Sequence, residues 1–442
     1  MAEATLLQIL EAREKRAELQ KSLISEYKTT LICFTMNIAG PEKLSPLIER
    51  AFSEGISLLK ERLAGSIVHS ETNIAVAGCE AMFCVSMSAQ QVKAICTEIE
   101  DRHPLGRLFD MDVLDKKGEK LSRRDLRGCI VCGKKGRECA AGRLHSVQEL
   151  KTVTNKMIAD YFFKKDCAYF GNLAYESLLE EVYTTPKAGL VDRNNNGSHT
   201  DMNVALFEKS ALALKPYFCR CVEIGSQTQN LPSNKAFEHL RKEGIEAEKT
   251  MFKATNGVNT HKGAVFSMGV LCGAVGRLWT AENPDCNIDD VLAMSSSLTK
   301  EALSEDFVNL DTSTAGGRVY REYQLRGIRG EVASGFLSAK NIGLPVFSRA
   351  LSEGFSRNDA GAVTLIHLIS SMEDTTIYNR GGKEGAEFAK NAARELLNSS
   401  EFPTIAQMEQ LDAEFMARNL SAGGCADILA VTYFLSKLQK PL

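Results

Sequence analysis

The spacing of apolar residues changes once along this chain, and that change constrains its architecture more than any other feature. Up to about residue 115, runs that alternate like strands and runs spaced like helices follow one another. From about residue 148 onward, strand patterns nearly disappear and helical patterns recur. A length of 442 residues allows two or three domains. We place the one boundary between residues 144 and 153, which predicts domains over residues 1–150 and 151–442.

The first domain should be small and of the α+β class. After an amphipathic helix in the first 28 residues, six elements follow in the order β-α-β-β-α-β, at residues 30–38, 46–63, 73–76, 81–87, 89–100 and 108–114. This order suggests a compact domain with a mixed sheet. The second domain should be larger and mostly α-helical, with helices at residues 148–163, 173–183, 201–217, 234–253, 262–281, 288–303, 360–371, 385–397, 405–419 and 425–438.

The composition narrows the classes of function. With 53 Lys and Arg against 56 Asp and Glu, the net charge of −3 excludes the broad positive field of a nucleic-acid-binding protein, so an anionic ligand must be held locally. The first residues lack the layout of a signal peptide. The apolar run at residues 263–281 contains Ser267, Arg277 and several glycines, which favours a buried helix over a membrane span. Thirteen cysteines, an odd number, are more typical of a protein in the reducing cytoplasm than of a disulfide-linked one.

Two carboxylates stand on the last expected strand of the first domain. Asp110 and Asp112 are two positions apart and therefore point to the same face, with Phe109 and Met111 on the other. Such a pair can share one divalent cation, usually Mg²⁺ that also bridges phosphates. A solvated strand face explains the same two residues, so both interpretations stay open.

The segment that follows is rich in Gly, Cys and Lys. Its spacing Cys129-x2-Cys132-x6-Cys139-x5-His145 supplies four soft ligands, as a closed tetrahedral zinc site requires. The alternative is that these cysteines are ordinary small residues in a cysteine-rich chain. The same segment resembles a phosphate-binding Walker A loop, but Lys135 stands where a Ser or Thr should reach Mg²⁺, and we reject that interpretation.

In the second domain, polar and glycine-rich motifs fall between the expected helices, where loops can carry chemistry. The loop over residues 184–202 holds Lys187, Asp192, Arg193, His199 and Asp201, although Asp201 could simply begin the next helix as its N-cap. Residues 256–263 precede the apolar helix and direct backbone N–H groups and Lys262 at one point, an arrangement suited to phosphate. Residues 326–335 and 374–385 each combine arginine with glycine, which allows close approach to an anion.

These motifs resemble two known families. Residues 103–124 (HPLGRLFDMDVLDKKGEKLSRR), with the Cys and His residues that follow, resemble the apo-citrate lyase phosphoribosyl-dephospho-CoA transferases, more loosely over residues 1–150. Residues from about 155 to the end resemble triphosphoribosyl-dephospho-CoA synthases through PKAGLVDRNNNGSHTDM, GVNTHKGAVFSMG, RGIRGEVASGF, NRGGKEG and RNLSAGGCADILA. Ala188 and Ala422 stand where the second family usually has proline, and Asn379 where His or Tyr is common.

The resemblance implies a fusion of two consecutive enzymes. The second domain would join ATP to 3'-dephospho-CoA, releasing adenine and forming 2'-(5''-triphosphoribosyl)-3'-dephospho-CoA. The first would transfer phosphoribosyl-dephospho-CoA to a serine of the citrate lyase acyl carrier (gamma) subunit and release pyrophosphate, with nucleotidyltransferase-like chemistry. Mg²⁺ is the expected cofactor of both reactions, and no nucleic acid or membrane is expected as a partner.

The resemblance also implies roles for single residues. We expect Asp192 and Asp201 to bind Mg²⁺ or act as base with the help of His199, and Asp110 and Asp112 to hold Mg²⁺ in the first domain. The expected substrate-binding residues are Lys187, Arg193, Asn259, His261, Lys262, Arg329, Glu331, Asp374 and Arg380 in the second domain, and Arg107, Arg123 and Arg124 in the first. Asp427 is a further candidate carboxylate. A nucleotide N-glycosidic hydrolase and a non-catalytic nucleotide-binding scaffold for the carrier remain alternatives.

Overall fold

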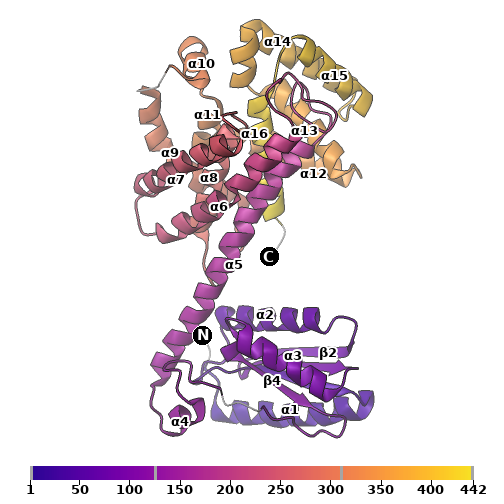
Figure 1. Cartoon of the computed structure of the whole chain (residues 1–442), viewed down its shortest axis with the longest axis vertical. Coiled ribbons are helices and arrows are strands. Elements are labelled where there is room, and N and C mark those ends of the chain that lie inside the picture. Colours follow the sequence, from indigo (N-terminus) through magenta and orange to yellow (C-terminus); the bar gives the residue numbers. More distant parts are fainter. Residues whose placement is uncertain (1–2, 124–126, 309–311, 440–442) are drawn as a thin grey trace. The chain divides into compact units, whose positions relative to one another are not determined.

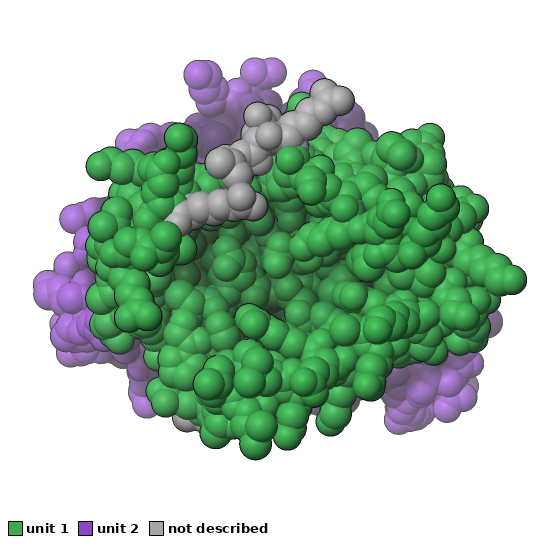
Figure 2. Space-filling view, turned by 90° about the horizontal axis from the view of Figure 1, so that it is seen from below, with its two compact units in different colours: residues 1–165, 280–283 green, residues 166–279, 284–442 purple. Residues whose placement is uncertain are grey.

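The chain forms two compact units. The computed structural model describes residues 3–123, 127–308 and 312–439. Unit 1 comprises Met1–Lys165 and Thr280–Asn283, and unit 2 comprises Asp166–Trp279 and Pro284–Leu442. The two units are coloured separately in Figure 2. The division falls inside helix α5 (Val147–Tyr183), and the domain boundary near residue 150 stays a prediction.

Unit 1 contains a four-stranded sheet with helices on both faces (Figure 1). Its elements are α1 (Leu6–Tyr27), β1 (Thr30–Met36), α2 (Pro46–Arg62), β2 (Ile67–Ala75), β3 (Gly78–Val85), α3 (Ala89–Arg102), a 3₁₀ turn (Gly106–Leu108) and β4 (Phe109–Leu114), followed by the short α4 (Gly136–Ala141) and the first part of α5. The predicted α+β class and element order are confirmed. The strand β2 begins earlier than expected because its exposed positions are mostly polar and give little hydrophobic signal.

The sheet is antiparallel rather than mixed, and this detail of the prediction was wrong. Its strand order is β2-β3-β1-β4, and all three described pairs are antiparallel. Each helical crossover passes over one strand: β3 lies between β1 and β2, and β1 lies between β3 and β4. Strands that run parallel therefore never become neighbours, as in a split βαβ arrangement.

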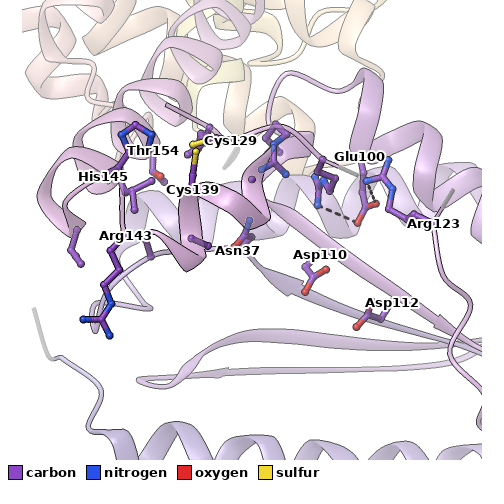
Figure 3. A pocket seen from close by; sticks show the side chains of 18 of the residues that line it. Asn37, Glu100, Asp110, Asp112, Arg123, Cys129, Cys139, Arg143, His145 and Thr154 are labelled. Atoms are coloured by element: carbon purple, nitrogen blue, oxygen red, sulfur yellow. Dashed lines mark hydrogen bonds and ion pairs between the residues drawn. The ribbon is translucent and has the colours of Figure 1, made fainter. Parts of the chain in front are cut away.

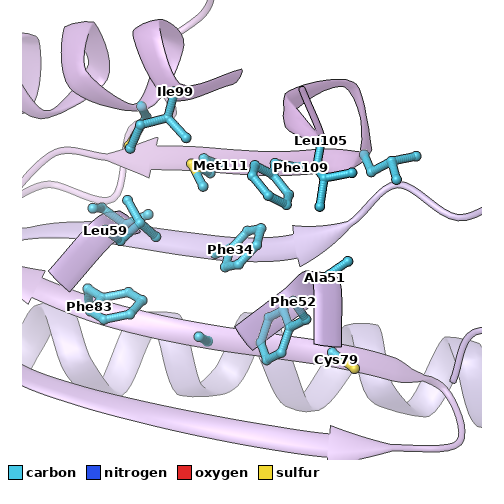
Figure 4. Packing of buried hydrophobic residues seen from close by; sticks show 14 of the residues in the cluster. Phe34, Ala51, Phe52, Leu59, Cys79, Phe83, Ile99, Leu105, Phe109 and Met111 are labelled. Carbon is cyan, nitrogen blue, oxygen red and sulfur yellow. The ribbon is translucent and has the colours of Figure 1, made fainter. Parts of the chain in front are cut away.

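The main core of unit 1 lies between the sheet and helices α2 and α3. The rings of Phe34, Phe52 and Phe109 stack or meet edge to face at centroid distances of 5.0 and 5.4 Å (Figure 4). Helix α1 covers a smaller cluster on the opposite face. Because Phe109 and Met111 are buried in the main core, alternation along β4 directs Asp110 and Asp112 to the other face, as the sequence predicts.

Unit 2 is helical, as expected. It holds the second half of α5 together with α6 (Val204–Gln227), α7 (Ser233–Ala254), α8 (Lys262–Leu278), α9 (Ile288–Val308), α10 (Ala315–Tyr323), α11 (Gly327–Ser334), a π-helical turn (Ala339–Gly343), α12 (Leu344–Ser352), α13 (Arg357–Ser371), α14 (Thr375–Ser399), α15 (Ile405–Ala417) and α16 (Gly423–Leu438). The apolar helix α8 is buried along most of its length. Among the helices in the described ranges, none combines the length and apolar character that crossing a membrane requires.

Helices α6 and α8 approach each other backbone to backbone at glycines. A Cβ atom added at Gly276 would lie 2.0 Å from the carbonyl oxygen of Val222, and one added at Gly225 would lie 2.1 Å from that of Gly273. Contacts this short cannot be relieved by rotating a side chain, since the obstructing atoms belong to the backbone. The close packing of α6 against α8 therefore requires glycine at these positions.

We predict that Gly276→Ala destabilises unit 2 by about 1–3 kcal/mol, because the added methyl group forces the two helices apart. Trp279, the only tryptophan of the chain, lies in unit 2, so its fluorescence during urea unfolding reports on this unit. Gly316→Ala is the matched control, because no described atom lies within 4 Å of its Cβ position. Equal midpoints for the two variants would contradict the close packing.

Candidate functional site

Unit 1 contains a cavity of about 950 Å³ that brings together most of the residues predicted in this domain. Its lining includes Arg107, Asp110, Asp112 and Arg123, and also the predicted zinc ligands Cys129, Cys139 and His145. Figure 3 shows Asp110 and Asp112 projecting from β4, with the cysteines and His145 on another part of the wall. Arg124 lies outside the described residues.

The two carboxylates of β4 differ in their electrostatic surroundings. Desolvation raises the pKa of Asp110, and the negative charge of Asp112 raises it further. Asp112 is paired with the ammonium of Lys120. A cation that bridges both carboxylates would offset their repulsion, so the pair fits a divalent metal.

Arginine side chains in this cavity are held by one buried carboxylate. Glu100 on α3 accepts a hydrogen bond from the Met111 N–H at 2.8 Å and from Arg123 Nη1 at 3.0 Å, and it lies 3.7 Å from Arg127 Nη1. Burial raises the pKa of Glu100. The buried Nε of Arg107 has no hydrogen-bond partner among the described residues, so this guanidinium has donor capacity left for a ligand.

Sequence reasoning missed Glu100, Arg127 and Lys120 in this cavity. Glu100 sits at the end of a helix whose pattern indicates only amphipathicity, and Arg127 follows the predicted arginines without a periodic signal. The Lys120 side chain reaches Asp112 across the turn after β4. Only the number of basic residues between positions 107 and 127 could have pointed to Lys120 and Arg127, and it carries no signal for Glu100.

The four predicted metal ligands converge in unit 1. The ligand atoms of Cys129, Cys132, Cys139 and His145 all lie within 4.8 Å of one another. They come from a turn, from α4 and from the segment before α5. The structure thus places together what the spacing predicted, and three of the four residues also line the cavity.

In unit 2, the loop after α5 is ordered by two buried carboxylates. Asp192 accepts hydrogen bonds from the backbone N–H groups of Lys187 at 2.9 Å, Asn194 at 2.7 Å and Asn195 at 3.0 Å. Asp412, which sequence reasoning missed, accepts from the Gly189 N–H at 2.8 Å and from Asn195 Nδ2 at 2.9 Å. The geometry of Asp192 is that of a residue that fixes the loop, since three donors occupy its two oxygens.

Lys187 and His261 are both buried in the interior of unit 2. Lys187 is only 2% exposed, and its ammonium pairs with the buried carboxylate of Glu181. His261 Nδ1 lies 2.7 Å from the Ser210 hydroxyl oxygen, and its buried Nε2 has no partner among the described residues. Burial, and then the charge of Lys187, lowers the pKa of His261 to about 3, so the ring is neutral. Glu181 was not predicted, because nothing in its helical pattern marks a buried charge.

Asp427 lies where the motif at the start of α8 contacts the motif at the start of α16. A Cβ atom at Gly263, at the start of α8, would lie 1.9 Å from Asp427 Oδ2, so only glycine allows the helix to lie against this carboxylate. Burial raises the pKa of Asp427, and the charges of Glu181 and Asp374 raise it further. Within the described residues, no hydrogen bond or ion pair to Asp427 is formed. It is therefore a half-buried carboxylate with free acceptor capacity.

His199 links two further motifs. Its Nδ1 lies 3.1 Å from Arg380 Nη2 and its Nε2 lies 3.0 Å from the Ser421 hydroxyl oxygen. Burial, and then the charge of Arg380, lowers the pKa of His199. Arg380 also donates to the carbonyl oxygen of Ser198 at 2.9 Å. Asp201 is exposed beside them, and its expected N-cap role is wrong because Asn203 caps α6.

A second cavity, of about 340 Å³, joins the arginine-glycine motifs of unit 2. Its lining includes Arg326, Glu331, Asp374 and Gly424. Asp374 caps α14 and accepts from the Cys425 N–H at 2.8 Å, and burial raises its pKa. Glu331 accepts from the N–H and the hydroxyl of Ser338, at 3.1 and 2.7 Å.

Four residues that were predicted to bind substrate do not join the buried groups described above. Arg193 lies over the ring of Tyr183 at 4.8 Å, and Lys262 pairs with Glu248 at 2.9 Å. The Asn259 side chain accepts from the Lys262 N–H at 3.3 Å, and Arg329 is exposed.

Two family models match the chain in succession. The model of apo-citrate lyase phosphoribosyl-dephospho-CoA transferase matches residues 4–161. The model of ATP:dephospho-CoA triphosphoribosyl transferase matches residues 167–442. The two matches follow the order of the two units.

Curated relatives extend over the same regions. The Protein CitXG of Haemophilus influenzae is 35% identical over 96% of this chain and 94% of its own length. The Protein CitXG of Leuconostoc mesenteroides subsp. cremoris is 34% identical over 98% of this chain and 97% of its own length. A 2-(5''-triphosphoribosyl)-3'-dephosphocoenzyme-A synthase of Haemophilus ducreyi is 34% identical over 70% of this chain and 99% of its own length.

We predict that Asp192→Asn lowers the free energy of unfolding of unit 2 by about 2–3 kcal/mol, since the new amide group faces backbone N–H donors that lose their charged acceptor. Trp279 fluorescence during urea unfolding measures the change. Asp201→Asn should have little effect, because Asp201 is exposed. The same loss in both variants would refute the loop-ordering role of Asp192.

Proposed function

The chain belongs to the family in which an apo-citrate lyase phosphoribosyl-dephospho-CoA transferase precedes an ATP:dephospho-CoA triphosphoribosyl transferase, and we propose which of its residues serve each reaction. It is a bifunctional transferase. One reaction makes 2'-(5''-triphosphoribosyl)-3'-dephospho-CoA from ATP and 3'-dephospho-CoA and releases adenine. The other transfers the phosphoribosyl-dephospho-CoA group and releases pyrophosphate. The hydrolase and scaffold alternatives are not favoured, because the matched families and relatives are transferases and synthases.

The reaction of unit 2 is a displacement at the anomeric carbon of the ATP ribose. Adenine leaves, and the 2'-hydroxyl of dephospho-CoA attacks and must lose its proton. Such a step needs a carboxylate or imidazole within hydrogen-bond reach of the hydroxyl. Asp427 is the group that suits this role best, because it has free acceptor capacity and a pKa raised by burial. The free acceptor capacity of this carboxylate is the main support for this part of the proposal.

The other predicted residues of unit 2 take supporting roles. Asp192 positions the loop rather than acting as base, because its oxygens already accept three N–H groups. His199 and Arg380 form one hydrogen-bonded pair beside Asp201. Arg380 can present its charge to the triphosphate while His199, kept neutral, holds its orientation. Asp201 remains our candidate for Mg²⁺ bound to the triphosphate, since its carboxylate is exposed.

In unit 1 the reaction is an attack on phosphorus. We propose that the nucleophile is a serine hydroxyl of the citrate lyase acyl carrier subunit, with pyrophosphate as the leaving group. The paired carboxylates of Asp110 and Asp112 fit Mg²⁺, and a metal held there would stabilise charge on the phosphate oxygens. Arg107 lines the same cavity with an unpartnered Nε, which suits a phosphate contact. Arg123 and Arg127, fixed by Glu100, supply further positive charge.

We also propose that the protein works in the cytoplasm. Its thirteen cysteines are spread over the chain, and those described are free thiols. A reducing compartment preserves such thiols.

We predict that Asp110→Asn and Asp427→Asn separate the two activities. Asp110→Asn should slow loading of the carrier by about 100-fold or more while adenine release from ATP and dephospho-CoA continues. Asp427→Asn should slow adenine release to a similar degree but still load the carrier when the triphosphoribosyl intermediate is supplied. Mass spectrometry of the carrier and quantification of free adenine measure the two steps.

Matched controls are available in each unit. Asp160→Asn in unit 1 and Asp290→Asn in unit 2 remove exposed carboxylates away from both centres and should leave both activities unchanged. The assignment of Asp110 fails if Asp110→Asn loads the carrier at the normal rate. Undiminished adenine release by Asp427→Asn would remove Asp427 from the reaction.

A further inference from the structure

Four side chains in the segment after β4 form a cluster that neither reaction requires. The ligand atoms of Cys129, Cys132, Cys139 and His145 lie within 4.8 Å of one another, and the sulfurs of Cys132 and Cys139 are 3.5 Å apart. A tetrahedral zinc ion with Zn–S bonds of about 2.3 Å spaces its sulfurs about 3.8 Å apart. We propose that these four residues hold one structural Zn²⁺ ion that shapes the cavity of unit 1.

Two of the thiols are presented by a tight turn. The Gly133 N–H donates to the carbonyl oxygen of Cys129 at 2.9 Å, and the left-handed conformation of Gly133, with φ of 73°, closes the turn. Gly128 and Lys135 pair as an antiparallel bridge at its base. The turn thus brings the sulfurs of Cys129 and Cys132 within 4.8 Å of each other and of the two other ligand atoms.

The histidine has the surroundings of a metal ligand. His145 Nδ1 lies 3.4 Å from a carboxylate oxygen of Glu149, one turn along the chain. Its other ring nitrogen, Nε2, is buried and has no hydrogen-bond partner within the described residues. With the Nδ1 proton held by a carboxylate, Nε2 is left as the ligand atom, as in many zinc sites.

The composition of the set determines the class of site. Three thiolates and one imidazole fill all four positions of a tetrahedral zinc, so no position is left open for water or substrate. Binding of the ion releases the three thiol protons and forms three Zn–S bonds and one Zn–N bond. The ion therefore stabilises the fold of the segment rather than taking part in group transfer.

The position of the cluster gives the ion its effect on the cavity. Cys129, Cys139 and His145 line the same cavity as Asp110 and Asp112 (Figure 3). The segment that carries them has only the short α4 as regular helix before α5 begins. The Gly136 N–H donates to the carbonyl oxygen of Arg127 at 3.1 Å, which ties the cluster to an arginine of the cavity. Zinc thus holds this wall of the cavity by joining the turn, α4 and the segment before α5.

The experiment begins with the metal content of the full chain, purified under reducing conditions. We expect about one zinc per chain, and cobalt(II) in its place should give the absorption of a tetrahedral thiolate site. Cys129→Ser and His145→Ala should each lose the metal. Cys219→Ser, a half-buried cysteine of unit 2, is the matched control and should retain it. Absence of zinc, iron with sulfide in its place, a Cys132–Cys139 disulfide without metal, or zinc retained in both ligand variants would each overturn the site.

The effect on the cavity is tested on the unaltered sequence. Chelation of zinc should abolish carrier loading and leave adenine release unchanged. Added zinc should restore carrier loading. Loading that survives chelation would overturn the cavity-shaping role. This activity arm rests on the proposed function, whereas the metal content does not. A zinc-loaded chain that fails to load the carrier would instead count against the proposed function.

Discussion

The contact between Gly263 and Asp427 is the constraint on which the centre of unit 2 depends. Because residue 263 lacks a side chain, the first turn of α8 lies directly against the carboxylate of α16. The same turn begins next to His261, whose ring lies near the buried Lys187. Residues from three distant motifs are brought together in this way. A side chain at residue 263 would displace Asp427 and remove the group that we assign to proton transfer.

In unit 1 the corresponding constraint is the alternation of β4. Phe109, Met111 and Val113 are buried in the main core. Asp110 and Asp112 therefore lie on the opposite face of the sheet. Their place on an edge strand next to the cysteine-rich segment puts them in the cavity. The positive charge that we propose for phosphate binding then comes from loop arginines held by Glu100. A stable hydrophobic core thus positions a pair of carboxylates that would repel each other in the absence of cations.

The features that the sequence predicts well are those with local periodicity or spacing. The order of strands and helices in unit 1, the face of Asp110 and Asp112, and the gathering of the four Cys and His ligands all follow from spacing along the chain. The motif at residues 326–335 was expected as a loop but forms α11, and the Arg-Gly-Gly motif lies inside α14, with a kink at Gly382. Glycine and arginine predict a loop at both places, whereas the structure has helix there, interrupted in α14 at Gly382.

Partners that are distant in sequence could not be predicted. Gly189 and Asp412, for example, are 223 residues apart. Asp192 looked like a catalytic carboxylate for a different reason: its donors are backbone N–H groups of the same loop, which leave no mark in the sequence pattern. Long-range contacts decide which carboxylates are satisfied and which, like Asp427, keep free acceptor capacity.

We propose that each unit carries one complete reaction centre. The most direct test mixes the Asp110→Asn and Asp427→Asn variants with ATP, dephospho-CoA and the carrier subunit, and measures the carrier by mass spectrometry. Each variant alone should leave the carrier unmodified, and the mixture should add the phosphoribosyl-dephospho-CoA group, because each variant supplies the centre that the other lacks. An unmodified carrier in the mixture, with adenine released, would contradict the separation of the two centres.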